Sequence, residues 1–91
     1  MIAEPMHEGQ FRLSAHGEHV IKERGIDPGW IALALSSADL TEPDRTDPDL
    51  THALKAIRER EGRVLRVVYN AGQKPPLIVT AFFDRSMRGK L

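Results

Sequence analysis

The run Leu77–Phe83 constrains the fold more than any other part of the sequence, because its seven residues include no charged side chain. β-Branched and aromatic residues are frequent in it, and these favour a strand over a helix. A strand this apolar is typical of a central position with both faces covered. The preceding run Val64–Tyr69 predicts a second strand, and a turn with two prolines over 70–76 joins them. The C-terminal half is therefore predicted to be a β-sheet.

The N-terminal half predicts two helices that follow each other closely. Ser14 can cap a helix over 15–24, and Gly25 can end it in the left-handed conformation. An Asp-Pro pair then provides a cap and a first helical residue for a strongly apolar helix over roughly 28–37. The linker is too short to separate these helices, so we expect a helix pair that covers another element.

The sequence pattern determines the secondary structure of the remaining segments less clearly. Residues 11–13 predict a short strand or a lead-in, and 38–50 reads as a loop with a short strand near 40–42. The stretch 50–61 fits either a helix or a strand, and periodicity does not decide between them. The fold class predicted is α+β, with an N-terminal helix pair packed on a three- to four-stranded antiparallel β-meander.

Length and composition predict one domain. The chain has 91 residues, which we divide into a flexible arm over 1–10, a single domain over 11–88 and a tail over 89–91. It has no cysteine, which excludes disulfides, thiolate metal sites and a cysteine nucleophile. No apolar run approaches the roughly 20 residues that cross a bilayer. We expect a cytoplasmic protein without a membrane segment or cofactor.

The charges are segregated although their formal sum is zero. Residues 26–50 have a net charge of −5, and residues 51–91 have a net charge of +6. Such asymmetry is typical of a face that binds a polyanion. It is equally the pattern of two solvated surfaces that neutralise each other.

The common catalytic and metal-binding motifs are missing. His16, His19 and Glu23 can be drawn as a metal site on the first helix, but they lack the tight motif and a further ligand, so we predict no metal. A triad of Ser14, His16 and an aspartate is rejected, since a serine before a helix is usually a cap and no glycine-flanked nucleophile elbow exists.

A set of histidine and arginine residues suggests another chemistry. His16 and Arg24 lie about two helical turns apart and can project to one side. If that helix packs on the sheet, strand and terminal residues can converge on it, namely Arg63, Arg66, Tyr69 and Arg85. Histidine can move a proton near neutral pH, and arginine can stabilise a phosphorane. Such a set can cleave RNA through the 2′-hydroxyl without a metal. The alternative is that these arginines are solvated or paired with carboxylates.

Three segments together resemble a known family. They read ERGIDPGWI over 23–31, LRVVY over 65–69 and IVTAFFDR over 78–85. This pattern is similar to a bacterial domain of unknown function that is regarded as related to the toxin ribonucleases of the RelE and BrnT kind. The resemblance covers about residues 11–88 and implies a strand over 51–59. It also implies a polar signature of His16, Arg24, Arg66, Thr80 and Arg85.

The sequence hypothesis is therefore a toxin-like, metal-independent ribonuclease or a descendant of one. Its predicted catalytic residues are His16, Arg24, Arg66 and Arg85, and its predicted binding residues are Lys55, Arg63, Tyr69 and Thr80. The expected partners are RNA, an antitoxin-like protein and a second copy of the chain. The alternative is a non-catalytic protein-interaction module with the same fold. The chain departs from basic toxins in its pI of about 6.9.

Overall fold

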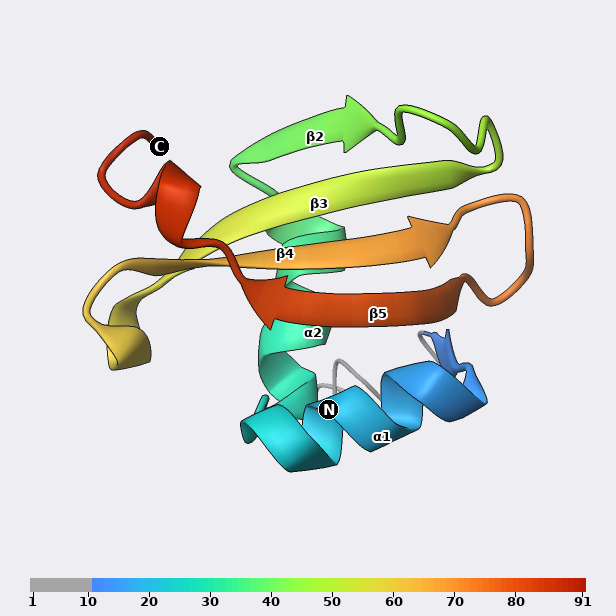
Figure 1. Ribbon diagram of the computed structural model, residues 1–91, viewed down its shortest axis with the longest axis horizontal. Coiled ribbons are helices and arrows are strands. Elements are labelled where there is room, and N and C mark those ends of the chain that lie inside the picture. The colour runs from blue at the N-terminus through green and yellow to red at the C-terminus, as the bar shows by residue number, and fades with distance from the viewer. Residues whose placement is uncertain (1–10) are drawn as a thin grey trace, which may run out of the picture.

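The computed structural model describes residues 11–91, and the arm predicted over 1–10 lies outside the described residues. Within this range two helices and one mixed five-stranded sheet form an α+β fold, which confirms the predicted class (Figure 1). The elements are β1 (Arg12–Leu13), α1 (Ala15–Arg24), α2 (Pro28–Ser37), β2 (Leu40–Pro43), β3 (Leu50–Ile57), β4 (Arg63–Asn70) and β5 (Leu77–Phe83), with short 3₁₀ helices η1 (Arg58–Arg60) and η2 (Arg85–Met87).

The sheet order is β1-β5-β4-β3-β2. Strands β2 to β5 form the predicted antiparallel meander, and the strand that the resemblance implied over 51–59 is confirmed as β3, which pairs with β4 along its whole length. The predicted sheet was too small by one strand. The additional strand is β1, whose two residues pair with β5 in parallel, so the short-strand reading of 11–13 is confirmed.

Both helices begin and end where the sequence predicts. The Ser14 hydroxyl accepts a hydrogen bond from the Gly17 amide at 2.9 Å, and Gly25 ends α1 with a φ of 63°. The Asp27 carboxylate accepts from the Gly29 amide at 2.8 Å and caps α2. These contacts are local in sequence, which is why pattern alone could locate them.

Helix α1 completes the outer edge of β5. The Ser14 hydroxyl donates to the carbonyl of Val79 at 3.2 Å, and Nη1 of Arg24 donates to the carbonyl of Ala81 at 2.8 Å. Strand β1 reaches only the first two residues of β5, so side chains of α1 satisfy carbonyls farther along.

Strand β5 lies between β1 and β4 in the sheet order, as a central strand would. The prediction that both of its faces are covered is corrected, because Thr80 and Phe82, on the face away from α2, are only half-buried.

The core lies between the sheet and α2. Ile31 and Ala34 of α2 pack in one buried cluster with Ala53, Leu65 and Val67 of the sheet. Side chains alternate along each strand, so the residues between these point to the opposite face. Neither α1 nor α2 lies over that face, as Figure 1 shows with α2 behind the sheet, although the short η2 contacts β4 at one end. His52 and Arg66 lie on this uncovered face.

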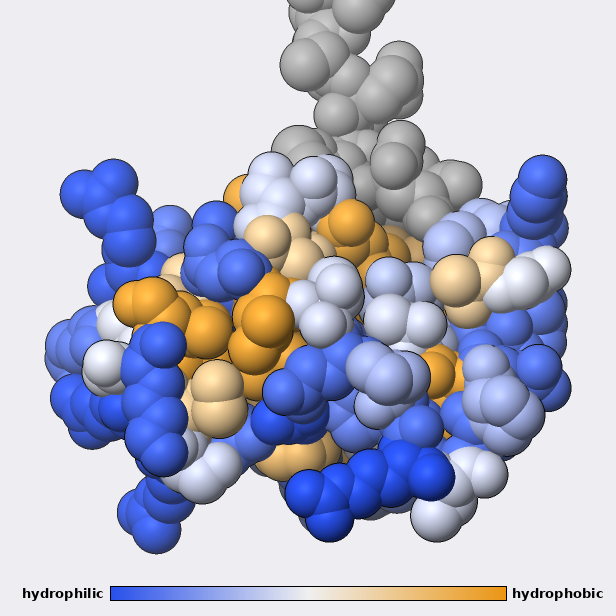
Figure 2. All heavy atoms as spheres, turned by 90° about the horizontal axis from the view of Figure 1, so that it is seen from above, coloured by the Kyte–Doolittle hydropathy of each residue, from blue (hydrophilic) through white to orange (hydrophobic). Residues whose placement is uncertain are grey.

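Strand β2 forms the other edge of the sheet. It is four residues long and ends in Pro43, and both features disfavour pairing with another strand. Figure 2 shows the molecule from this side, with an apolar patch surrounded by hydrophilic side chains. Leu40 on β2 is 37% exposed. An edge of this kind does not favour a homodimer built by extending the sheet.

The close approach of α1 to β5 gives a testable prediction at Gly17. A Cβ atom there would lie 2.8 Å from the carbonyl oxygen of Ile78, which is backbone and cannot move away cheaply. Gly17→Ala should therefore lower the free energy of unfolding by about 1–2 kcal/mol, although alanine gains about 1 kcal/mol of helix propensity. Urea denaturation measures the change, with His19→Ala as an exposed control on the same helix. A more stable Gly17→Ala protein would contradict the packing described here.

Candidate functional site

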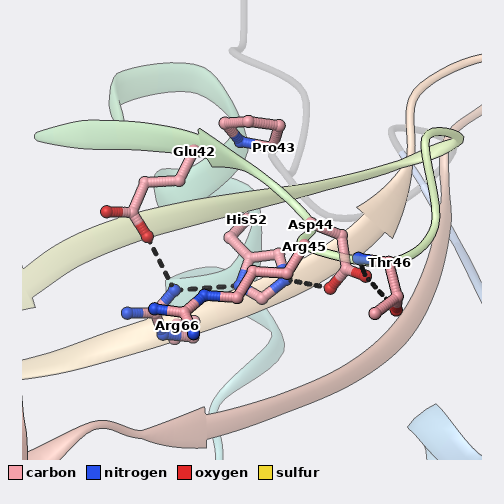
Figure 3. Close-up of a pocket in the computed structure, with 7 residues that line it drawn as sticks. All are labelled: Glu42, Pro43, Asp44, Arg45, Thr46, His52 and Arg66. Carbon is pink, nitrogen blue, oxygen red and sulfur yellow. Dashed lines mark hydrogen bonds and ion pairs between the residues drawn. The ribbon is translucent and has the colours of Figure 1, made fainter.

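The uncovered face of the sheet contains a cavity of about 570 Å³. It lies where β2 ends and the following loop returns to β3, as Figure 3 shows. We call it the histidine cavity, and its lining residues are Glu42, Pro43, Asp44, Arg45, Thr46, His52 and Arg66. Two carboxylates and two guanidinium groups line it, so its charge is balanced when His52 is neutral.

His52 is held through both ring nitrogens. Its Nε2 lies 2.7 Å from Oδ1 of Asp44, and its Nδ1 lies 2.9 Å from Nη1 of Arg66. A guanidinium group can only donate, so Nδ1 must accept the hydrogen bond from Arg66. The proton of the neutral ring is therefore on Nε2, which donates to Asp44. The neighbours of His52 thus select one tautomer and one orientation.

Arg66 links His52 to two further carboxylates. Its Nη1 donates to Oε1 of Glu42 at 3.1 Å, and its Nε donates to Oδ2 of Asp84 at 2.8 Å. The Arg66 side chain is only 13% exposed, and a cation so far removed from water needs such partners. Its Nη2 makes no hydrogen bond to any residue in the range 11–91 and remains a free donor.

The carboxylates of the network are themselves fixed. Oδ2 of Asp44 accepts from the backbone amides of Thr46 and Asp47 at 3.2 and 3.0 Å, which orders the loop after β2. The hydrogen bond from His52, followed by these amides, holds the pKa of Asp44 well below its ordinary range. The pKa of Asp84 is also lowered, first by the Ser86 hydroxyl and also by Arg66. Both groups are anionic at neutral pH.

This arrangement can transfer a proton. A histidine that becomes protonated would be stabilised by Asp44, which also fixes the ring plane. Nδ1 can accept a proton only after Arg66 has moved its Nη1 donor away. A ligand that competes for the Arg66 guanidinium would therefore free the basic nitrogen, which couples ligand binding to proton transfer.

The four predicted catalytic residues do not form one site. His16 is exposed on α1 and makes no side-chain hydrogen bond or ion pair with the described residues. Arg24 is bonded to the edge of β5, Arg66 lies in the histidine cavity, and Arg85 is exposed on η2. The convergence expected around His16 is absent because α1 borders the edge of β5 and not the uncovered face.

The predicted binding residues are also dispersed. Tyr69 packs against the core on the helix-covered face, and Thr80 is half-buried on the opposite face. Lys55 forms an ion pair with Asp39 at 3.3 Å. Arg63 lies over the ring of Phe83 at 4.9 Å. Arg63 is therefore close to other arginines, whereas Lys55, Tyr69 and Thr80 lie elsewhere on the molecule.

A second group of arginines does come together beyond the end of β5. Arg24 and Arg63 line a cavity of about 460 Å³ that we call the arginine cavity, and its lining residues are Arg24, Arg60, Arg63, Phe82 and Phe83. An adjoining cavity of about 280 Å³ contains Arg63, Arg85 and Arg88, but it also contains Glu61 and Asp84. Each cavity is therefore lined by two residues that the sequence hypothesis named. Arg24 and Arg63 line the arginine cavity, and Arg63 and Arg85 line the adjoining one.

Sequence reasoning missed His52 and its partner Asp44, and it missed Glu42 and Asp84, the carboxylates that bond to Arg66. The available signal was the strand reading of 50–57, which places His52 in phase with Leu54 and Ala56 on one face. The register of β3 against β4 then decides that His52 lies opposite Val68, one diagonal step from Arg66. That register depends on contacts far apart in sequence.

Among residues 11–91, no three His, Asp or Glu side chains gather as a metal site. His19 and Glu23 pair at 3.3 Å on the exposed side of α1. No helix in this range is long and apolar enough to span a membrane.

Comparison with protein families gives one match. Residues 13–83 match the family described as "Domain of unknown function (DUF4258)". The chain belongs to the DUF4258 family. Searches of the curated proteins and of the solved structures found no match.

The DUF4258 match includes the whole lining of both cavities. All residues that line the histidine cavity and the arginine cavity lie between residues 13 and 83. Asp84, which orients Arg66, and the residues of η2 follow the matched segment. The core of the candidate site thus belongs to the DUF4258 domain itself.

Asp44 should make the free energy of unfolding depend on pH in the acidic range. Since its pKa in the folded chain lies below its ordinary value of 3.8, its stabilising effect is complete above that value and is lost as pH falls further. Asp44→Asn should therefore have lower stability than the wild type at neutral pH and a shallower loss below pH about 4.

Urea unfolding followed across this pH range tests the prediction. Asp49→Asn is a control in the same loop, because the Asp49 carboxylate accepts no hydrogen bond from the described residues. Parallel pH curves for the wild type and Asp44→Asn would contradict the proposed contact with His52.

Proposed function

We propose that this protein is a toxin-like ribonuclease that cleaves RNA without a metal ion and uses His52 as its acid–base residue. The observation that supports this best is the position of His52, with Asp44 on one ring nitrogen and Arg66 on the other, at the wall of an open cavity. Histidine, carboxylate and arginine together supply proton transfer and charge stabilisation at a phosphodiester.

The reaction is a transfer within one RNA strand. A phosphate of the strand binds the Arg66 guanidinium, whose Nη2 is free among the described residues, and draws Nη1 away from His52. Nδ1 then accepts the proton of the 2′-hydroxyl, the 2′-oxygen bonds to phosphorus, and the bond from phosphorus to the 5′-oxygen breaks. The imidazolium returns the proton to that 5′-oxygen. The products are a 2′,3′-cyclic phosphate and a 5′-hydroxyl.

This proposal keeps Arg66 from the sequence hypothesis and moves the acid–base role from His16 to His52. His16 has no group near it in the described residues that would orient its ring or stabilise its charge. The resemblance to the RelE and BrnT toxins supplies the expectation of RNA as substrate and of an antitoxin-like partner. In this proposal the protein acts in the cytoplasm.

A non-catalytic interaction module is the second candidate. One observation favours it, because both ring nitrogens of His52 already have protein partners and Arg66 contacts Glu42 and Asp84. A network closed in this way can serve only to order the uncovered face. The two candidates differ in whether His52 is needed for RNA cleavage.

His52→Asn should separate the two candidates. Loss of a general acid–base residue lowers a rate by about 10²–10⁴-fold, whereas the asparagine can retain polar contacts. The wild type, His52→Asn and His16→Asn are incubated with RNA in the presence of a metal chelator, and the ends of the products are identified. We expect cyclic phosphate ends from the wild type and His16→Asn but not from His52→Asn.

Induced expression in bacteria extends this test. Growth and total RNA integrity are followed at matched levels of soluble protein for the same three chains. Arrest that is lost only in His52→Asn supports the proposal. Intact RNA and normal growth with the wild type, together with no cleavage of purified RNA, would instead favour the interaction module.

A further inference from the structure

Three arginines from separate parts of the chain face the arginine cavity. Arg24 comes from the end of α1, Arg60 from η1 and Arg63 from the start of β4. The rest of the lining is aromatic, from Phe82 and Phe83, and no carboxylate contributes to it. The cavity is therefore strongly positive, in contrast to the balanced charge of the histidine cavity.

The three guanidinium groups are held in place. Arg63 lies over the ring of Phe83 at 4.9 Å, and Arg60 lies over the rings of Trp30 and Phe83 at 5.4 and 5.8 Å. Stacking fixes the plane of a guanidinium but uses none of its N–H donors. Arg24 uses one donor for the carbonyl of Ala81 at 2.8 Å, and Arg60 uses one for the carbonyl of Gly25 at 3.4 Å. Most donors of the set remain available to a ligand.

No ion pair within residues 11–91 offsets the repulsion between these three like charges. The ion pairs formed within residues 11–91 involve Lys55 and Arg66 as their lysine and arginine members, and none involves these three arginines. The adjoining cavity is less suited to an anion, because Glu61 and Asp84 line it beside its arginines. An anion in the arginine cavity would remove the repulsion. Arginine binds phosphate especially well, since its planar donors match two phosphate oxygens.

Phe82 connects the two cavities. It is half-buried, lines the arginine cavity and lies directly opposite Arg66 in the pairing of β4 with β5. Phe82 is on the face of Arg66, whereas Arg63 and Phe83 are on the helix-covered face, so a chain bound at the arginine cavity would reach the histidine cavity by passing around the end of β5 at Phe82. An aromatic ring beside a phosphate site also suits an RNA strand, whose bases stack on such rings.

We propose that the arginine cavity binds a backbone phosphate of single-stranded RNA and that the neighbouring base stacks on Phe82. The choice of RNA rests on the function proposed above. The positive cavity supplies the affinity for a polyanion that the charge-balanced histidine cavity lacks. RNA bound in this way passes around the end of β5 at Phe82 and extends toward His52.

Binding is tested with an oligonucleotide that cannot be cleaved. A fluorescent single-stranded RNA with 2′-O-methyl groups is titrated with the wild type, Arg60→Gln and Arg58→Gln, and anisotropy gives the dissociation constants. Arg58 is an exposed residue of the same 3₁₀ helix and does not line the cavity, so it is the matched control. Arg60→Gln should weaken binding about tenfold, and Arg58→Gln less than about twofold.

Salt dependence gives a second readout. Loss of one phosphate contact to a single strand should make the slope of log affinity against log salt shallower by about 0.7 for Arg60→Gln. Arg63→Gln repeats the test in case Arg60→Gln is unfolded, and circular dichroism monitors folding of each variant. Equal effects of Arg58→Gln and Arg60→Gln, or no binding by the folded wild type at low salt, would overturn the proposed site.

The same titration separates this inference from the cleavage reaction. His52→Asn should bind the probe with the affinity of the wild type, because His52 lies outside the arginine cavity. A wild type that binds the probe through Arg60 but does not cleave unmodified RNA would support the site and overturn the proposed catalysis. Cleavage that is unaffected by Arg60→Gln at low RNA concentration would overturn the site alone.

Discussion

The organisation of the uncovered sheet face depends on the single cation of Arg66. Its guanidinium bonds to Glu42 on β2, to His52 on β3 and to Asp84 just after β5, so one side chain of β4 ties four segments together. A charge that is only 13% exposed requires such pairing, and the three acceptors in turn require the charge. His52 is therefore oriented by an interaction that also fixes how the strands meet. The contacts of Arg66 therefore both orient His52 and hold the strands together.

The acidic segment and the basic segment of the sequence contribute to two different cavities. The acidic segment supplies Glu42 and Asp44, which balance Arg45 and Arg66 around His52. The basic segment supplies Arg60 and Arg63, which join Arg24 around a cavity without carboxylates. A neutral chain can thus hold a polyanion locally although its total charge gives no attraction. In the proposed function, His52 transfers the proton and the arginine cavity holds a backbone phosphate, with Phe82 between the two cavities.

Local signals made the helices predictable, whereas the candidate site depends on pairing across the sheet. Ser14, Gly25 and Asp27 cap their helices through contacts within a few residues, and these were read correctly. His52 and Arg66 meet only because β3 and β4 pair in one register, and Asp84 joins them through the return of β5. The sequence contained all the residue types of a His–Arg site but not the information on which histidine is paired. The resemblance implied a strand over 51–59, and the strand observed there, β3, is what places His52 on the uncovered face.

The tautomer of His52 is the most direct test of this account. Long-range ¹H–¹⁵N correlation spectra at neutral pH distinguish a protonated ring nitrogen from an unprotonated one, and the exposed His16 provides an internal reference. We predict a single tautomer for His52, with the proton on Nε2 and a hydrogen bond accepted at Nδ1, and we predict that Arg66→Gln abolishes this preference. A His52 spectrum that shows the averaged shifts of an exposed ring, or a proton on Nδ1, would contradict the network between Asp44, His52 and Arg66.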